Sequence, residues 1–282
     1  MISCSLSGGL GNQLFQIFIT IAFSIKLCRK CVFLYEDFTR GASTIRPTYW
    51  NTFLKPIKYM ATLPYSVSQP TIIKEKHFHY EEMDFAKMRE FEHVNLVGYF
   101  QSYKYFEHSY DMIYRMLCID KIKETLINKL HLNNKLDNYV SMHFRIGDYK
   151  KIQHYHPLAT YNYYKGALTH IQKCNPDVPF TILFFCEDID MNDVMEKINK
   201  LMLEFPNYKF IRCDNKLADW EQMIFMSCCH HNIIANSSFS WWGAYFNSTK
   251  DKIVCYPSLW FGPAANNNTR DLCPSEWVRI NV

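Results

Sequence analysis

Residues 232–255, NIIANSSFSWWGAYFNSTKDKIVC, contain the strand–helix–strand pattern that decides the fold class. The apolar run Asn232–Ala235 predicts a buried strand, Phe239–Phe246 a helix, and Lys252–Cys255 a second strand. Two strands that are joined by one helix pair in parallel through a right-handed crossover. This stretch therefore predicts part of a parallel α/β sheet.

The same alternation extends back to Tyr139, which makes the second half of the chain one regular series. Because ligands of such sheets bind beyond the carboxyl ends of the strands, the loops that follow the strands are the places to look for a site. The further strands are expected at Tyr139–Phe144, Phe180–Phe185 and Tyr208–Ile211, and the further helices at Tyr161–Gln172, Met191–Leu203 and Trp220–Cys229.

The first half also begins as an α/β unit. A strand at Ile2–Leu6, a glycine loop at Ser7–Asn12, a helix at Gln13–Cys28 and a strand at Cys31–Tyr35 follow one another. Prolines interrupt the pattern between Pro47 and Pro70, before a strand at Val94–Val97 and helical patterns over Tyr103–Leu132. The polar break Asn133-Asn134-Lys135 predicts two α/β domains, 1–134 and 135–282, with a cleft between them.

Composition and charge limit the class of protein. Of the 282 residues, 48% are hydrophobic, so a packed interior is feasible, and the net charge of +4 without a long basic run gives little support to a nucleic-acid surface. Eleven cysteines without framework spacing indicate a reduced compartment. The apolar run Leu14–Ile25 is too short to cross a bilayer and no signal-peptide pattern precedes it. We therefore expect a cytoplasmic protein without a membrane span, leaving peripheral membrane association open.

The glycine loop Ser7–Gln13 joins a strand to a helix. Its glycines let backbone amides approach an anion at the helix start, which makes Gly9, Gly11 and Asn12 candidate ligand residues. The loop is neither a P-loop nor a dinucleotide fingerprint, because no Gly-Lys-Ser/Thr follows and Leu14 stands where the third glycine belongs. A plain tight turn is the alternative.

The segment His143–Tyr149, HFRIGDY, follows the first strand of the second half. Strand alternation places His143 and Arg145 on one face. The guanidinium of Arg145 can hold a diphosphate with two parallel hydrogen bonds and neutralise a leaving group, as a divalent metal does elsewhere. Asp148 is expected either to hold Arg145 or to act as a general base.

Two further segments offer candidates. Ser237, Ser238 and Phe239 follow an apolar strand, and hydroxyls and free amides at a helix start suit a phosphate or a ribose. Their alternative role is ordinary capping. Asp188-Ile189-Asp190 has the Asp-x-Asp form of a Mn²⁺ site, but a solvated helix start also favours acidic residues. We predict no metal there.

Taken in order, these motifs resemble the α-1,2-fucosyltransferase family. The resemblance covers essentially the full chain, and its longest segment is the most specific. The matching pieces are Gly9–Gln16, Gly98–Phe106, His143–Tyr149, Tyr163-Tyr164, Phe185–Asp188, Met226–Ala244, Pro257–Phe261 and Pro274–Trp277.

The resemblance implies a GT-B-like fold with two facing Rossmann-like domains, parallel sheets and helices on both faces. It implies inverting transfer of L-fucose from GDP-β-L-fucose to a glycan hydroxyl without metal or other cofactor. Domain 1–134 would supply the acceptor side and the glycine loop, and domain 135–282 would bind the donor. Arg145 matches the arginine at the β-phosphate, His143 the histidine beside the nucleotide, and Asn12 the asparagine that reaches the donor. Ser237, Ser238 and Phe239 match the turn that lines the nucleotide.

Three positions depart from the family pattern. Ile146 stands where a second arginine is usual, Cys186-Glu187-Asp188 stands for Ser-Asp-Asp, and Gln222 aligns with an aspartate that suits the guanine edge. Gln222 is therefore the expected base contact, with Glu221 or Asp219 as alternatives. A transferase of another nucleotide sugar and a non-catalytic sugar- or nucleotide-binding relic stay open as other functions. The acceptor pocket is expected from Thr39–Glu82 and the loop Lys150–Ala159.

Overall fold

The computed structural model describes residues 1–39, 45–63, 69–132 and 136–282, and the chain divides into two compact units. The first unit contains Met1–Lys121 and Asn267–Pro274, and the second contains Ile122–Asn266 and Ser275–Val282. The expected boundary at 134/135 lies outside the described residues. The boundary between the two compact units lies within helix α4 (Ile119–Lys129), between Lys121 and Ile122.

A short segment near the C-terminal end belongs to the first unit because its polar groups are bound there. The hydroxyl of Ser102 donates to the backbone oxygen of Asp271, at 2.6 Å. The ammonium of Lys104 lies 2.6 Å from the Asp271 carboxylate, which also accepts from the backbone N–H of Tyr80. These contacts explain why residues 267–274 separate from the sequence around them.

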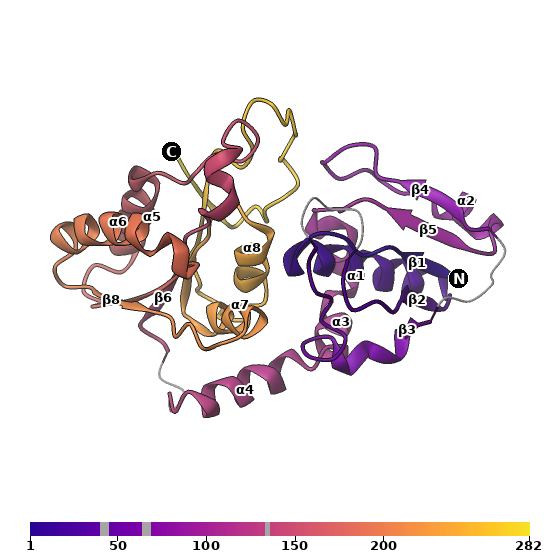
Figure 1. Ribbon diagram of the computed structural model, residues 1–282, viewed down its shortest axis with the longest axis horizontal. Coiled ribbons are helices and arrows are strands. Elements are labelled where there is room, and N and C mark those ends of the chain that lie inside the picture. The colour runs from indigo at the N-terminus through magenta and orange to yellow at the C-terminus, as the bar shows by residue number, and fades with distance from the viewer. Residues whose placement is uncertain (40–44, 64–68, 133–135) are drawn as a thin grey trace. The chain divides into compact units, whose positions relative to one another are not determined.

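The first unit contains a five-stranded parallel sheet in the order β3-β2-β1-β5-β4 (Figure 1). The central strand β1 buries Ile2 and Cys4 and pairs on both sides, with Ile2 opposite Cys31 in one neighbour and Val94 in the other. The strands are β1 (Ile2–Cys4), β2 (Cys31–Leu34), β3 (Ala61–Thr62), β4 (Thr71–Lys74) and β5 (Val94–Val97).

Helix α1 (Leu10–Leu27) is the core helix of this unit. It is buried on nearly all sides and packs against the sheet on one side and against aromatic side chains on another, including a Phe18–Phe106 contact at 5.2 Å. It ends where Cys28 adopts φ 55° and the N–H of Arg29 reaches back to the Ser24 oxygen. The shorter helices are α2 (Phe85–Glu90) and α3 (Tyr110–Met116).

The second unit contains a six-stranded parallel sheet in the order β11-β10-β9-β6-β7-β8. Counted within the unit, this is the strand order of a doubly wound dinucleotide-type fold. The strands are β6 (Tyr139–His143), β7 (Thr181–Phe185), β8 (Lys209–Arg212), β9 (His231–Ile233), β10 (Val254–Pro257) and β11 (Val278–Ile280). The helices are α5 (Tyr161–Cys174), α6 (Met191–Glu204), α7 (Asp219–Cys228) and α8 (Ser238–Tyr245).

Alternation along β6 explains which helices cover which face of this sheet. Val140 and Met142 enter a hydrophobic cluster with side chains of α5 and α6. On the other face, the amide of Asn232 donates to Ser141 Oγ and to the backbone oxygen of Met226 in α7, and His143 contacts α8. The helices therefore lie on both faces of the sheet (Figure 1).

The predicted fold class, α/β with two parallel sheets flanked by helices, is confirmed. Every strand and helix expected after Tyr139 is present, with ends that shift by a few residues. Strands β3, β4 and β11 and helix α2 lie outside the predicted elements. That the two units face each other stays a prediction.

Candidate active site

The centre of the second sheet is its topological switch point. From β6 the chain continues towards β7 and β8, and from β9 it continues towards β10 and β11, in the opposite direction across the sheet. The connections after β6 and β9 run in opposite directions there, and open α/β sheets bind ligands beyond the carboxyl ends of the strands at such a point. Those two loops carry most of the predicted donor-binding residues.

His143 ends strand β6 with only 8% of its surface exposed. Its ring lies 5.6 Å from that of Phe239, and no group among the described residues forms a hydrogen bond with its Nδ1 atom. Burial, with a smaller contribution from the Arg145 charge, lowers the pKa of His143 to about 3. The imidazole is therefore neutral, with one nitrogen left for a polar ligand group.

Arg145 is held by two carboxylates. Its Nη1 donates to Glu187 Oε1 at 2.6 Å and its Nη2 donates to Asp148 Oδ1 at 2.5 Å. The arginine side chain is 19% exposed, whereas both carboxylates are more than half exposed. The expected Asp148–Arg145 contact is thus present, and Glu187 is a second partner of the arginine. Whether Asp148 also acts as a base stays a prediction.

Ile146, which stands at the position of the usual second arginine, lies in the hydrophobic cluster of the second unit. The next residue, Gly147, has φ 31° and donates its N–H to the buried carboxylate of Asp190 at 2.7 Å. The chain therefore turns sharply after Arg145, and the Ile146 side chain points into the core and away from a ligand.

The two aspartates of Asp188-Ile189-Asp190 have different partners. Asp188 pairs with Arg212 and accepts from Asn215, whereas Asp190 holds the turn at Gly147 and lies 3.6 Å from Lys150. Among the described residues, no group of three or more His, Cys, Asp or Glu side chains is arranged to hold a metal ion. The two carboxylates serve as partners for cations and a backbone amide within the fold.

Helix α8 begins at the switch point with the predicted serine turn. Ser237 is its N-cap, and its hydroxyl oxygen accepts from the N–H of Phe239 at 3.3 Å. Ser238 is the first residue of the helix. The capping role is thus observed, and a role of Ser237, Ser238 and Phe239 in nucleotide binding stays a prediction.

Gln222 lies in the first turn of α7, where the amide of its side chain donates to the backbone oxygen of Leu217 at 3.0 Å. The alternatives are engaged more strongly. Glu221 caps the helix through the N–H of Ala218 and pairs with Lys129, and Asp219 accepts from the N–H of Trp220. The Gln222 oxygen is not used in the Leu217 bond, so it can still accept from a base.

In the first sheet β1 and β5 are neighbours, and the loops that follow these two strands meet through Asn12 and Gln101. Gly8 has φ 74°, and a Cβ atom there would lie 2.6 Å from the Asn12 side-chain nitrogen. Gly9, the N-cap of α1, faces open space. The carboxamide oxygen of Asn12 accepts from Gln101, in the loop after β5, at 2.9 Å. Gly11 lies one residue before Asn12, in the first turn of the same helix.

The loop after β5 is fixed by Glu75, which no sequence argument singled out. Its two carboxylate oxygens accept from the backbone N–H groups of Tyr99 and Phe100, at 2.8 and 2.9 Å. Burial raises the pKa of Glu75 to about 7. Gln101 follows directly, so Glu75 orders the loop that holds Asn12.

Three residues of these clusters were missing from the predicted set: Gln101, Glu187 and Tyr149. Each lies inside a segment that matched the family, namely Gly98–Phe106, Phe185–Asp188 and His143–Tyr149. Their position inside these motifs was therefore the sequence feature that could have pointed to them. What the sequence could not supply is the direction of each side chain, which depends on the turns at Gly98 and Gly147.

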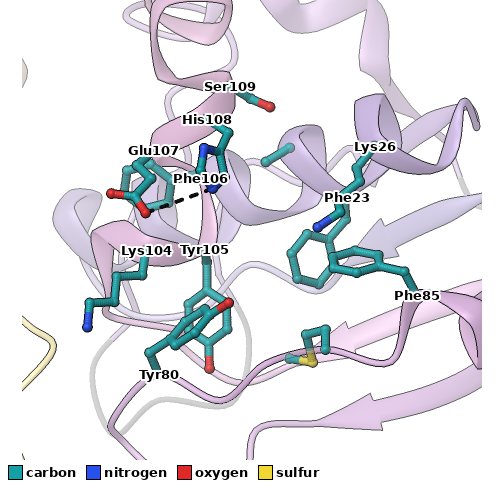
Figure 2. A pocket seen from close by; sticks show the side chains of 12 residues that line it. Phe23, Lys26, Tyr80, Phe85, Lys104, Tyr105, Phe106, Glu107, His108 and Ser109 are labelled. Carbon is teal, nitrogen blue, oxygen red and sulfur yellow. Dashed lines mark ion pairs between the residues drawn. The ribbon is translucent and has the colours of Figure 1, made fainter.

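A separate cavity of about 130 Å³ lies in the first unit (Figure 2). Aromatic side chains from α1, α2 and the segments around residues 80 and 105 line it, with Phe23 and Phe85 in contact at 4.9 Å and Tyr80 and Tyr105 at 4.8 Å. Its α1 residues belong to the second half of that helix, away from the glycine loop. It includes none of the predicted catalytic or donor-binding residues, and of the segment Thr39–Glu82, from which the acceptor pocket was expected, it includes Tyr80.

Within the described part of the chain, one helix is long and apolar enough to cross a membrane. It is α1, whose Leu10–Leu27 window is 83% buried in the unit. Its surroundings are those of a core helix.

An arginine, a neutral histidine and a capped helix start at one switch point are typical of α/β proteins that bind phosphorylated ligands. Residues 2–281 match the model of glycosyl transferase family 11, and the chain belongs to that family. The family resemblance seen in the motifs is thereby confirmed, and the protein is a glycosyltransferase.

Two curated relatives match over nearly their whole length. The chain is 29% identical to the O-antigen biosynthesis glycosyltransferase WbnK of Escherichia coli, covering 99% of this chain and 100% of that protein. It is 28% identical to an alpha-1,2-colitosyltransferase of Escherichia coli, covering 99% of each.

Solved structures match at 9% identity and a TM-score of 0.45. One is the glycosyl transferase family 9 protein from Veillonella parvula DSM 2008, and the match covers 100% of this chain and 85% of that protein. Another is POFUT1 in complex with GDP-fucose, and the match covers 90% of this chain and 97% of the POFUT1 chain.

Proposed function

We propose that this glycosyltransferase moves L-fucose from GDP-β-L-fucose to a hydroxyl of a galactose-type acceptor, with inversion and an α-1,2 linkage. Family membership and the motif resemblance support the proposal, as does the relative whose name gives α-1,2 transfer of colitose. The second unit would bind the donor and the first would supply the acceptor side. No metal or other cofactor enters the proposed reaction.

In the proposed reaction the acceptor oxygen forms a bond to C1 of the sugar while the bond from C1 to the β-phosphate oxygen breaks. The electron pair of that bond leaves with GDP, so negative charge grows on the diphosphate. Arg145 would stabilise this charge from the end of β6, because its planar guanidinium can donate two hydrogen bonds at once. The acceptor proton is released as the new bond forms.

The observation that carries the proposal is the position of Arg145 and His143 together at the switch point. Arg145 supplies the fixed positive charge, and His143 adds a neutral ring with an unpartnered nitrogen. Asp148 and Glu187 hold the guanidinium before the ligand arrives. Asn12, Gly9 and Gly11 are proposed as further donor contacts, with Ser237, Ser238 and Phe239 at the nucleotide and Gln222 at the guanine.

A screen of nucleotide sugars for enzyme-dependent hydrolysis tests this function. GDP-fucose, GDP-mannose, UDP-galactose and a nucleotide-linked colitose would be compared, each with excess EDTA and again after Mn²⁺ is added. We expect GDP-fucose to be hydrolysed fastest and EDTA to leave the rate unchanged. A loss of activity that Mn²⁺ restores would overturn the metal-free mechanism.

A transferase of another nucleotide sugar is the second candidate, favoured by two features. Ile146 removes a positive charge from the site, and Gln222 offers the base a neutral amide where the family has a carboxylate. Faster hydrolysis of a different donor in the same screen would select it. GDP binding without any turnover would point to a non-catalytic relic.

A further inference from the structure

Beyond Arg145, three rings continue the site in a row. The guanidinium carbon of Arg145 lies 4.9 Å from the ring centre of Tyr149. The Tyr149 ring stacks on that of His156, at 4.7 Å between centres and 21° between planes. His156 in turn lies 5.5 Å from Phe261. We call Tyr149, His156 and Phe261 the ring stack.

The backbone that carries this stack is held from several directions. The N–H of Gly262 donates to the oxygen of Tyr155 at 2.9 Å, so the segment with Phe261 runs beside the segment with His156. A Cβ atom on Gly262 would lie only 2.3 Å from the backbone oxygen of His154. The buried amide of Asn236 donates to the backbone oxygens of Pro157 and Trp260 and joins both segments to the strand end of β9.

We infer that the ring stack positions the guanidinium of Arg145 for the diphosphate, an inference that rests on the proposed function. Asp148 and Glu187 fix the guanidinium through hydrogen bonds that lie in its plane, but they are exposed, and an incoming diphosphate would compete for the same N–H groups. The Tyr149 ring holds the guanidinium from a further direction, at 4.9 Å, and the Tyr149 hydroxyl interacts with it as well. Tyr149, His156 and Phe261 are therefore positioning residues.

The charge state of His156 agrees with this arrangement. Burial lowers the pKa of its imidazole, while the nearby Asp148 carboxylate opposes that shift and Arg145 adds to it. Near neutral pH the ring is uncharged, so it can support Tyr149 without repelling the guanidinium.

The test compares ring removal with ring replacement in the full chain, using hydrolysis of GDP-fucose. His156→Ala and Tyr149→Ala remove rings, whereas His156→Phe and Tyr149→Phe keep a ring in place. We expect the alanine variants to lose about tenfold or more in kcat with a smaller change in KM. A displaced guanidinium would stabilise the transition state less while still allowing the donor to bind. The phenylalanine variants should recover most of that loss. His170→Ala, at a partly buried histidine of α5, is the matched control.

Equal losses in the alanine and phenylalanine variants, or none in either, would overturn the inference. A second measurement needs no turnover. The unfolding midpoints of Arg145→Ala, Tyr149→Ala and the double variant form a cycle, and residues in contact should give effects that do not add. If the parent hydrolyses no nucleotide sugar but the cycle is non-additive, the proposed function fails while the Arg145–Tyr149 contact stands. An additive cycle would refute the stack itself.

Discussion

Arg145 has an environment that a lysine cannot reproduce. Two carboxylates take its outer nitrogens, and the Tyr149 ring lies against the group. Lysine keeps the charge but has no planar set of donors. We predict that Arg145→Lys folds with a melting temperature close to that of the parent and loses about 10²–10³ in turnover, as when one transition-state donor is removed.

The matched control for this variant is Arg212→Lys. Arg212 ends β8 in the same sheet and pairs with one carboxylate, that of Asp188. We expect it to keep turnover near the parent value. Initial rates of donor hydrolysis and thermal unfolding would be recorded for both variants. A fully active Arg145→Lys enzyme would show that this guanidinium does not bind the leaving group.

At the residue scale, the sequence predicted the direction of a side chain only where regular secondary structure fixes it. Strand alternation predicted that His143 and Arg145 lie on one face, but β6 ends at His143, and Arg145 already lies two residues beyond the strand. Beyond the strand this period ends. Ile146 enters the core and Tyr149 turns back under Arg145 because Gly147 adopts a left-handed conformation, φ 31°. Neither direction follows from residue order alone.

At the scale of elements, the loop before α1 separates a glycine needed by the fold from one available to a ligand. Gly8 needs its positive φ and has Asn12 beside it, whereas Gly9 has φ −75° and open space in front. We predict that Gly9→Ser keeps or raises the melting temperature, because serine is a preferred N-cap, yet loses roughly 100-fold in turnover, since the added side chain would fill the space used by the ligand.

Gly8→Ser is the companion variant. A non-glycine residue in this backbone region costs roughly 1–2 kcal/mol, so its melting temperature should drop by several degrees. Rates and melting curves for the two serine variants therefore distinguish an effect on ligand binding, expected for Gly9→Ser, from an effect on stability, expected for Gly8→Ser. If Gly9→Ser retains the parent rate, the glycine loop is only a tight turn.

Most of the predicted strands are largely buried. The residues of β6, β7 and β9 are buried almost throughout, including the polar His231 and Asn232 of β9, and α5 and α6 have one apolar side towards the sheet. Strand β4, in contrast, alternates between half-buried and exposed residues at the edge of its sheet, and β3 has only two residues. Whether such a segment forms a strand depends on its pairing with a neighbouring strand, which is a tertiary effect.

At the scale of the whole molecule, acid stability should depend on the second unit. Burial lowers the pKa of His143 to about 3 and that of His231 to about 4, and both residues belong to the second unit. An unfolded histidine titrates near 6.5, so below that pH the unfolded chain binds protons that the folded chain does not. The free energy of unfolding of the second unit therefore rises with pH between about 4 and 6.5, and this stability is lost as the pH falls through that range.

The variant His143→Phe measures the contribution of His143, because it keeps a ring against Phe239 but has no imidazole to bind a proton. Relative to the parent, its free energy of unfolding should improve by up to about 1.4 kcal/mol for each pH unit below 6.5, and the difference should be constant above pH 7. Denaturant unfolding of both proteins from pH 7.5 to 4.5 measures this, and the pH dependence of the difference cancels the packing effect of the substitution. If the two curves stay parallel over the whole range, the imidazole is not held neutral in the folded protein. The proposed donor site would then contain a histidine cation beside Arg145 in place of a neutral ring.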